Sequence, residues 1–254
     1  MRRNTRILTA CVAAGMALAG LTAVTTSAYA DNASGLAACK HFSNDIPPVR
    51  VIGPSHPAGS TAPQISLAGR LAAPASIHGS FAAGKVTIGF NRVPGAKAYR
   101  VWRNAQSVAW ISDWGQASLS AVDSAPCRNG KYTVVAMANE LGADSSYGQL
   151  SGAYRLEDSG SLASYRIPAG TTYSFTISSY NDPGQTASGY TAGLGKCAVD
   201  TRVIPWGTRF YVDGYGYCYA ADIGTWIQGN IVDIWLPGSQ ADNWGMQKRT
   251  ITIK

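Results

Sequence analysis

The chain of 254 residues carries a formal net charge of +7, and 14% of its residues are charged. Its basic residues form no dense Lys/Arg run, so we expect no nucleic-acid partner, whereas retention near an anionic polymer would suit this balance. The length is sufficient for two small domains. We predict no cofactor.

The first thirty residues have the pattern of a secretory signal peptide. Three arginines stand within the first six positions, residues 7–25 are mainly apolar, and Ala28-Tyr29-Ala30 offers small residues for cleavage after Ala30. The alternative is a membrane anchor, but no later apolar run reaches the roughly 20 residues that span a bilayer. We therefore expect an exported protein that leaves the membrane after cleavage, with 18 basic and 14 acidic residues and a net charge of +4.

Four cysteines remain in the mature chain, and an even number in an exported protein favours two disulfides. They are Cys39, Cys127, Cys197 and Cys218. Three pairings are possible. If each domain closes its own bridge, the pairs are Cys39–Cys127 and Cys197–Cys218, which we favour. A metal site is not expected, because there is no CxxC motif and no histidine near the last two cysteines.

Residues 31–74 contain six prolines among Ala, Ser and Gly, and we interpret them as a spacer in which any strand is short. Residues 75–156 instead show short alternating runs such as KVTIGF and YTVVAMAN, separated by turn residues. This pattern is typical of an antiparallel β-sandwich. The stretches VTIGFNRVPGAKAYRVWRN and DSAPCRNGKYTVVAMANELGADSSYG resemble a fibronectin type III domain, although Phe90 stands where that family usually has a tryptophan.

The sandwich carries five large aromatic residues of interest, for which two interpretations remain. Large aromatic residues commonly fill sandwich interiors or strand surfaces, which we favour. Alternatively, two tryptophans in SVAWISDWGQ could stack on sugar rings if both are exposed. The five residues are Tyr99, Trp102, Trp110, Trp114 and Tyr132, and the two tryptophans in question are Trp110 and Trp114.

A linker is expected at 157–168, and residues 169–254 then form a separate unit without any glutamate or histidine. Proton transfer there would have to use aspartate, tyrosine, lysine or water. Six strand candidates follow one another, namely TTYSFTISSY, KCAVDTRV, TRFYVDGYG, YCYAAD, NIVDIW and KRTITIK. Six short strands can close into a barrel, so the predicted fold class is all-β throughout.

Six aspartates lie in this last unit, and they divide into two groups. Three stand beside turn-forming residues, which is sufficient to explain them: Asp182, Asp213 and Asp242. The other three are embedded among apolar or β-branched neighbours: Asp200 in CAVDTRVIPWGT, Asp222 in YAADIGT and Asp233 in NIVDIWL. The second group is the candidate for chemistry.

The stretch AVDTRVIPWGTRFYVDGYGYCYAADIGTWIQGNIVDIW, followed by NWGMQKRTITI and preceded by FTISSYNDPGQTASGYTAGLG, resembles the 3D domain, named for three aspartates. The resemblance covers about 173–254. It implies a six-stranded double-psi β-barrel related to MltA-type lytic transglycosylases and, more distantly, to expansins. It also implies that Asp233 transfers the proton, that Asp222 supports it, and that Asp200 shapes or polarises the cleft.

Glycosidic cleavage requires an acid that is neutral at the working pH, and an apolar setting beside another carboxylate raises a pKa in that direction. Asp233 has such neighbours. The alternative is that all three aspartates merely satisfy backbone N–H groups and fix the barrel. The segment DIGTWIQG also departs from the family's DTGGAIKG: Ile223 replaces a hydroxyl residue and Gln228 a lysine.

We predict substrate contacts from Trp226, as a stacking face, and from Gln228 and Tyr190. The favoured hypothesis is a secreted, monomeric bacterial cell-wall protein that acts on peptidoglycan glycan strands in the manner of a lytic transglycosylase, with the sandwich as a spacer or adhesion module. The alternatives are a non-catalytic glycan-binding or expansin-like wall protein and a structural wall or spore component.

Overall fold

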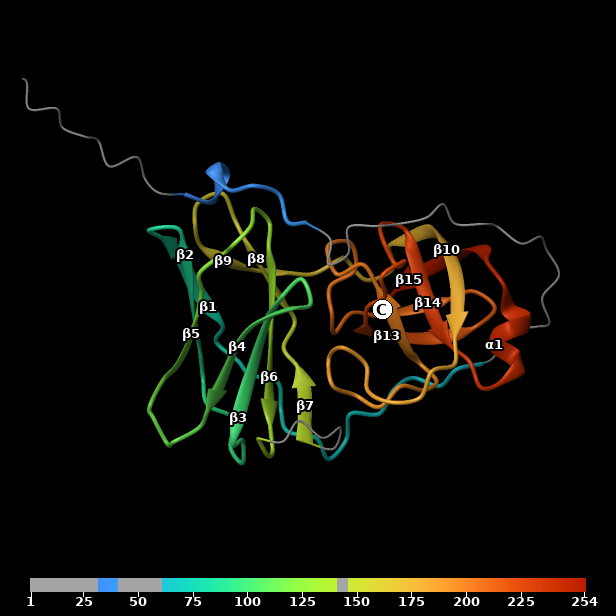
Figure 1. The fold of residues 1–254 in the computed structure, drawn as a ribbon, viewed down its shortest axis with the longest axis horizontal. Coiled ribbons are helices and arrows are strands. Elements are labelled where there is room, and N and C mark those ends of the chain that lie inside the picture. The colour runs from blue at the N-terminus through green and yellow to red at the C-terminus, as the bar shows by residue number, and fades with distance from the viewer. Residues whose placement is uncertain (1–31, 41–60, 141–145) are drawn as a thin grey trace, which may run out of the picture.

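The computed structural model describes residues 32–40, 61–140 and 146–254, and almost all of its regular structure is strand (Figure 1). The predicted signal peptide lies outside these residues. None of the helices in the described ranges is long and apolar enough to cross a membrane. The elements are η2 (Ala33–Gly35), β1 (His78–Ala82), β2 (Lys85–Phe90), β3 (Ala98–Arg103), β4 (Gln106–Ser112), β5 (Leu119–Asp123), β6 (Lys131–Met137), β7 (Tyr147–Leu150), β8 (Ala153–Leu156), β9 (Leu162–Tyr165), β10 (Thr172–Tyr180), β11 (Lys196–Val199), β12 (Arg209–Val212), β13 (Gly216–Asp222), β14 (Ile231–Trp235), α1 (Ser239–Trp244) and β15 (Gln247–Ile253).

The first unit is a sandwich of two sheets. One sheet has the order β1-β2-β5, and the other has the order β4-β3-β6-β8-β9 with β7 also paired to β6. Between them lies a core in which Phe90 and Tyr99 pack with ring centroids 5.2 Å apart. Tyr99, Trp102 and Tyr132 are fully buried, which confirms their interpretation as core residues. The finer resemblance to a fibronectin type III domain stays a prediction.

The centre of the second sheet is covered on both faces. Every residue of β6 is buried, because one face meets the three-stranded sheet and the other packs against the second unit. Trp102 of β3 and Trp206 of the second unit meet edge to face, with ring centroids 5.3 Å apart. The sandwich and the second unit therefore share a continuous apolar core, and Figure 1 shows them side by side with β7 toward the second unit.

The second unit is a closed barrel with the strand order β10-β14-β11-β13-β12-β15. Two neighbouring pairs, β10 with β14 and β11 with β13, run parallel, and the remaining pairs run antiparallel. The six strands are those expected from the sequence, so the prediction of an all-β chain with a sandwich and a six-stranded barrel is confirmed. The Cys197–Cys218 disulfide joins the starts of β11 and β13, as predicted.

The segments expected to be a spacer and a linker make specific contacts where the structure describes them. Cys39 is bonded to Cys127 on the sandwich, as predicted. Ala62 pairs with Gly216 of β13, and its N–H donates to the carbonyl of Tyr215 at 2.8 Å. A side chain at Gly216 would overlap the Ala62 backbone, so only glycine allows this approach. The expected linker contains β9, which extends the sandwich sheet through pairing with β8.

Candidate functional site

The barrel places two of the three candidate aspartates in one row of cross-strand neighbours. Asp233 of β14 and Asp222 of β13 both pair with Ala198 of β11, from opposite sides, and Ser178 of β10 pairs with Asp233. Residues that pair directly across a sheet point to the same face. The residues on either side of Asp233 in β14 are fully buried in the barrel, so the row faces outward. The two aspartates lie two strand spacings apart, which places their Cα atoms roughly 10 Å from each other.

Asp233 has the environment of a proton donor. Burial raises the pKa of Asp233 to about 6, and the hydroxyl of Ser178, which donates to its Oδ1 at 2.8 Å, opposes the rise. The negative charges of Asp222 and Asp182 raise this pKa further. A carboxyl group of this kind holds its proton up to mildly acidic pH, where an ordinary aspartate is already ionised.

Asp222 is better supplied with hydrogen-bond donors. Burial raises its pKa, but the backbone N–H groups of Ala187 and Ile223 donate to Oδ1 at 2.8 and 2.9 Å and limit the rise. The Tyr180 hydroxyl donates to Oδ2 at 3.4 Å. Burial also raises the pKa of Tyr180, so this hydroxyl keeps its proton at all ordinary pH values. Asp222 is therefore the carboxylate of the pair that is better prepared to carry a negative charge.

Asp200 lies apart from this row and has a different environment. Burial would raise its pKa, but the Arg202 guanidinium and the N–H groups of Gly229 and Arg202 outweigh that effect, and the pKa is lowered. Arg202 Nε donates to Oδ1 at 2.9 Å and the Gly229 N–H donates to Oδ2 at 2.8 Å. Gly229 adopts a φ of +60°, which favours glycine. An ionised, paired Asp200 cannot donate a proton, so its contacts favour a positioning role.

The segment DIGTWIQG (222–229), which departs from the family pattern, is thus held at its two ends by Asp222 and Asp200. Asp222 accepts from the N–H of Ile223 at its start, and Asp200 accepts from the N–H of Gly229, its last residue. Between them the Trp226 side chain is 46% exposed, so it offers an aromatic face to solvent. Gln228 donates to the Thr225 carbonyl at 3.3 Å, a contact within the segment itself. The predicted contacts from Trp226 and Gln228 stay predictions.

The prediction that Tyr190 contacts substrate is wrong. Its side chain is fully buried, and its hydroxyl donates to the carbonyl of Gly148 in β7 at 2.7 Å. The Arg70 guanidinium lies 4.8 Å from the ring centroid. The physical reason is that the barrel packs closely on the sandwich at this point, so the ring fills the boundary between the two units.

The sequence interpretation missed two residues that touch the acids, Ser178 and Tyr180. Both belong to β10, whose inward positions are the buried Phe175 and Ile177. The alternation in FTISSY therefore indicated that they face outward. The parallel pairing of β10 with β14, which brings Ser178 to Asp233, joins segments more than 50 residues apart and leaves no local sequence signal. No group of three His, Cys, Asp or Glu side chains in the described ranges could hold a metal ion.

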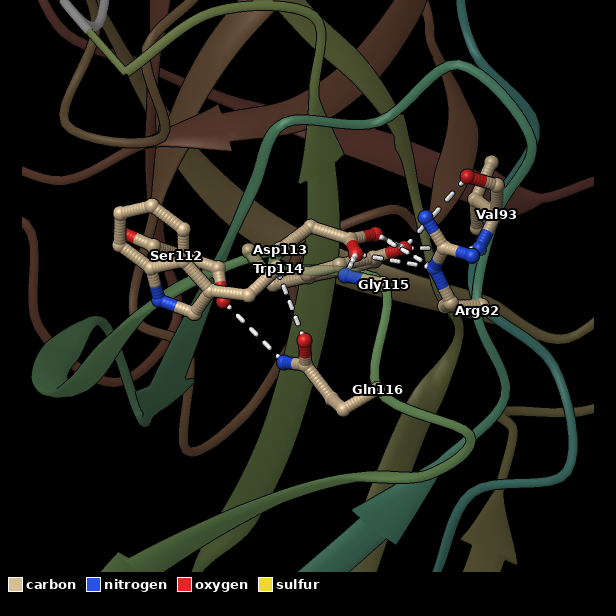
Figure 2. A network of polar contacts seen from close by, with 8 residues as sticks. Arg92, Val93, Ser112, Asp113, Trp114, Gly115 and Gln116 are labelled. Atoms are coloured by element: carbon tan, nitrogen blue, oxygen red, sulfur yellow. Dashed lines mark hydrogen bonds and ion pairs between the residues drawn. The ribbon is translucent and has the colours of Figure 1, made fainter.

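Trp110 and Trp114 of the sandwich are exposed, by 43% and 85% respectively. Figure 2 shows how the turn carrying Trp114 is held. Asp113 accepts from Arg92 Nε at 2.9 Å and from the Gly115 N–H, while Gln116 accepts from the Trp114 N–H at 2.7 Å. The indole of Trp114 lies on the other side of this network from Arg92. The condition for the sugar-stacking alternative, that both tryptophans are exposed, is met.

Comparison with known protein families gives one family model that matches residues 196–254, a range that contains all three candidate aspartates. This region is a 3D domain. A stretch of 58 residues is 48% identical to the cell wall-binding protein YocH of Bacillus subtilis strain 168, and 85 residues are 40% identical to the putative cell wall shaping protein YabE of the same organism. These alignments cover 22% and 32% of this chain. The chain spans about a fifth of the length of these curated relatives, 20% in each case. No solved structure matches significantly.

Proposed function

We propose that this protein is an exported cell-wall protein whose 3D barrel cleaves peptidoglycan glycan strands by lytic transglycosylation. The observation that carries the proposal is the pair of Asp233 and Asp222 on the outer face of the barrel. Burial raises the pKa of Asp233 in this pair to about 6. The names of the two relatives, one cell wall-binding and one a putative cell wall shaping protein, support the wall as the location.

A single carboxyl group can carry out both proton transfers of this reaction. Protonated Asp233 gives its proton to the glycosidic oxygen as the bond from C1 to that oxygen breaks and the sugar becomes oxocarbenium-like. The C6 hydroxyl of the same muramic residue then attacks C1, and its proton passes to the Asp233 carboxylate. The acid is regenerated, no water is consumed, and the product is a 1,6-anhydro sugar.

The neighbouring groups suit this cycle. Ionised Asp222 raises the proton affinity of Asp233 before cleavage and adds negative charge near the developing cation. The Ser178 hydroxyl, 2.8 Å from Oδ1, stabilises the carboxylate that remains after donation. Asp200 has a positioning role, because it fixes the far end of the segment that begins at Asp222.

The experiment that tests the proposal is the digestion of purified sacculi by the mature protein, with the products separated by mass. We expect 1,6-anhydromuropeptides from the wild type and none from the Asp233→Asn variant. Ordinary reducing ends would instead indicate a hydrolase. Because the reaction needs protonated Asp233, kcat/KM should fall as the pH rises through about 6.

A second candidate function is glycan binding without cleavage. It is favoured by the exposed indoles of Trp114 on the sandwich and Trp226 in the barrel segment, since aromatic faces stack on sugar rings. Sacculus binding that is equal in the wild type and in Asp233→Asn, with no product after prolonged incubation, would select this function over the catalytic one.

A further inference from the structure

A cavity of about 250 Å³ opens where the sandwich meets the barrel. Its barrel wall includes Asp200, Arg202 and the segment 223–225, which directly follows Asp222. Its sandwich wall is the turn of Asn104 and Ala105, and Lys40 lies at its side. The cavity therefore lies between the barrel segment that follows Asp222 and the Asn104 turn of the sandwich.

A second cavity, of about 430 Å³, continues this one over the sandwich. The two share Lys40 and Asn104 as lining residues, and the second extends to the Cys39–Cys127 disulfide. Together they have the size of a small-molecule site, which is roughly 300 to 1,000 Å³. We name the two the interdomain groove.

The charge of the interdomain groove is set by Lys40. Arg202 is paired with Asp200, and Arg103 is paired with Asp123. Lys40 is exposed, and within the ranges that the structure describes it forms no ion pair. One positive charge in the groove is thus unneutralised, and the ligand it favours is an anion.

The sandwich wall is held in a fixed shape. Asn104 and Ala105 have φ values of +45° and +67°, as in the tight turn of a two-residue hairpin. The backbone N–H of Asn104 donates to the Lys131 carbonyl at 2.9 Å, and its side-chain oxygen accepts from the Lys131 N–H at 3.0 Å. Because Ala105 also packs against the shared core, the turn cannot swing away from the barrel.

We propose that the interdomain groove binds an acidic peptide stem carried by the glycan on which the barrel acts, with Lys40 pairing with a stem carboxylate. The proposal rests on the proposed function, because the glycan in the Asp222 and Asp233 row would carry its substituent into the groove. The Asn104 amide and the Thr225 hydroxyl would form hydrogen bonds with the peptide backbone, and the Lys40 ammonium would pair with a carboxylate of the stem. The sandwich is then part of the binding site.

The test is isothermal titration of the full mature chain with a disaccharide tetrapeptide, and with the same compound after its carboxylates are amidated. The wild type should bind the acidic form about three- to fivefold more tightly, a size typical of an exposed ion pair. Lys40→Met should abolish the difference, whereas Lys97→Met, an exposed lysine at the end of β3 opposite to the Asn104 turn, should retain it. Thr225→Glu should weaken binding of the acidic form more than Thr225→Gln, which isolates charge from bulk.

The proposal is overturned if the acidic and amidated forms bind equally, if neither binds, or if Lys40→Met and Thr225→Glu bind the acidic form like the wild type. Tighter binding of a glycerol phosphate oligomer than of the acidic muropeptide would also overturn it, in favour of a phosphate polymer. The anhydro-product assay on sacculi is read separately. Retained cleavage with an unselective groove refutes this proposal alone, and selective binding without cleavage refutes the catalytic function alone.

Discussion

Replacing Asp233 with asparagine should stabilise the protein at neutral pH while abolishing glycan cleavage. Burial moves the pKa of Asp233 from 3.8 to about 6. That difference of about two pH units, at ~1.4 kcal/mol each, sets a ceiling of about 3 kcal/mol on the cost of ionising Asp233 in the folded state. Since the side chain is only partly enclosed and water relaxes around it, we expect about 2 kcal/mol of stabilisation in Asp233→Asn.

The sign follows from proton binding. Between pH ~4 and ~6 the folded chain retains a proton on Asp233 that the unfolded chain has lost, so wild-type stability falls as the pH rises through this window. Asparagine does not titrate, and its side-chain oxygen can still accept from Ser178. The stability advantage of the variant should therefore be near zero at pH 4 and complete at pH 7.5.

Thermal unfolding of the wild type and Asp233→Asn at pH 4, 6 and 7.5 measures this effect. At pH 7.5 the Tm of the variant should be higher by about 4 to 8 °C. A variant that is destabilised by the same amount at every pH would refute the reasoning, because the carboxylate would then be a scaffold group that holds backbone or hydroxyl partners. Asp233→Glu, which keeps the acid but displaces it, separates loss of the proton from loss of position.

Three further predictions concern the supporting structure. Replacing Cys197 and Cys218 together with serine should lower the free energy of unfolding by about 3 kcal/mol, because a loop of 21 residues is released. Urea denaturation without reductant measures this change, and an unchanged midpoint would contradict it. Asp200→Asn should cost about 2 kcal/mol, because the partly exposed Arg202 guanidinium loses its carboxylate partner. The pH at which residual cleavage declines should stay unchanged, and a shift of that pH would assign Asp200 to proton transfer. Trp114→Ala should leave the Tm within about 2 °C but weaken sacculus pull-down about fivefold, and unaltered binding would remove the sandwich from glycan recognition.

Much of the fold could be predicted because its signals are local. The six barrel strands alternate in short runs between turn residues, and the structure forms strands at each of them. The two disulfides followed from an even cysteine count and from one bridge in each unit. The sandwich was indicated in the same way, although β6 is buried at every position because the barrel covers its outer face.

The candidate site was only partly predictable. Asp222 and Asp233 were singled out because acids among apolar neighbours are unusual, and the structure brings them to either side of Ala198. Tyr190 was misassigned, since nothing in GYTAGLG reveals that the ring is enclosed by β7.

The sequence by itself determined the strand periods, the even cysteine count and the identity of the acids, because these depend on residue type and on short spacings. Only the tertiary structure decided which acid is buried and which is paired. Asp200, Asp222 and Asp233 are chemically identical, and their pKa values diverge because packing gives Asp200 an arginine, Asp222 two backbone donors and Asp233 little besides one hydroxyl. The interdomain groove has the same origin, since its walls come from segments about 100 residues apart that meet only when the sandwich and the barrel pack together.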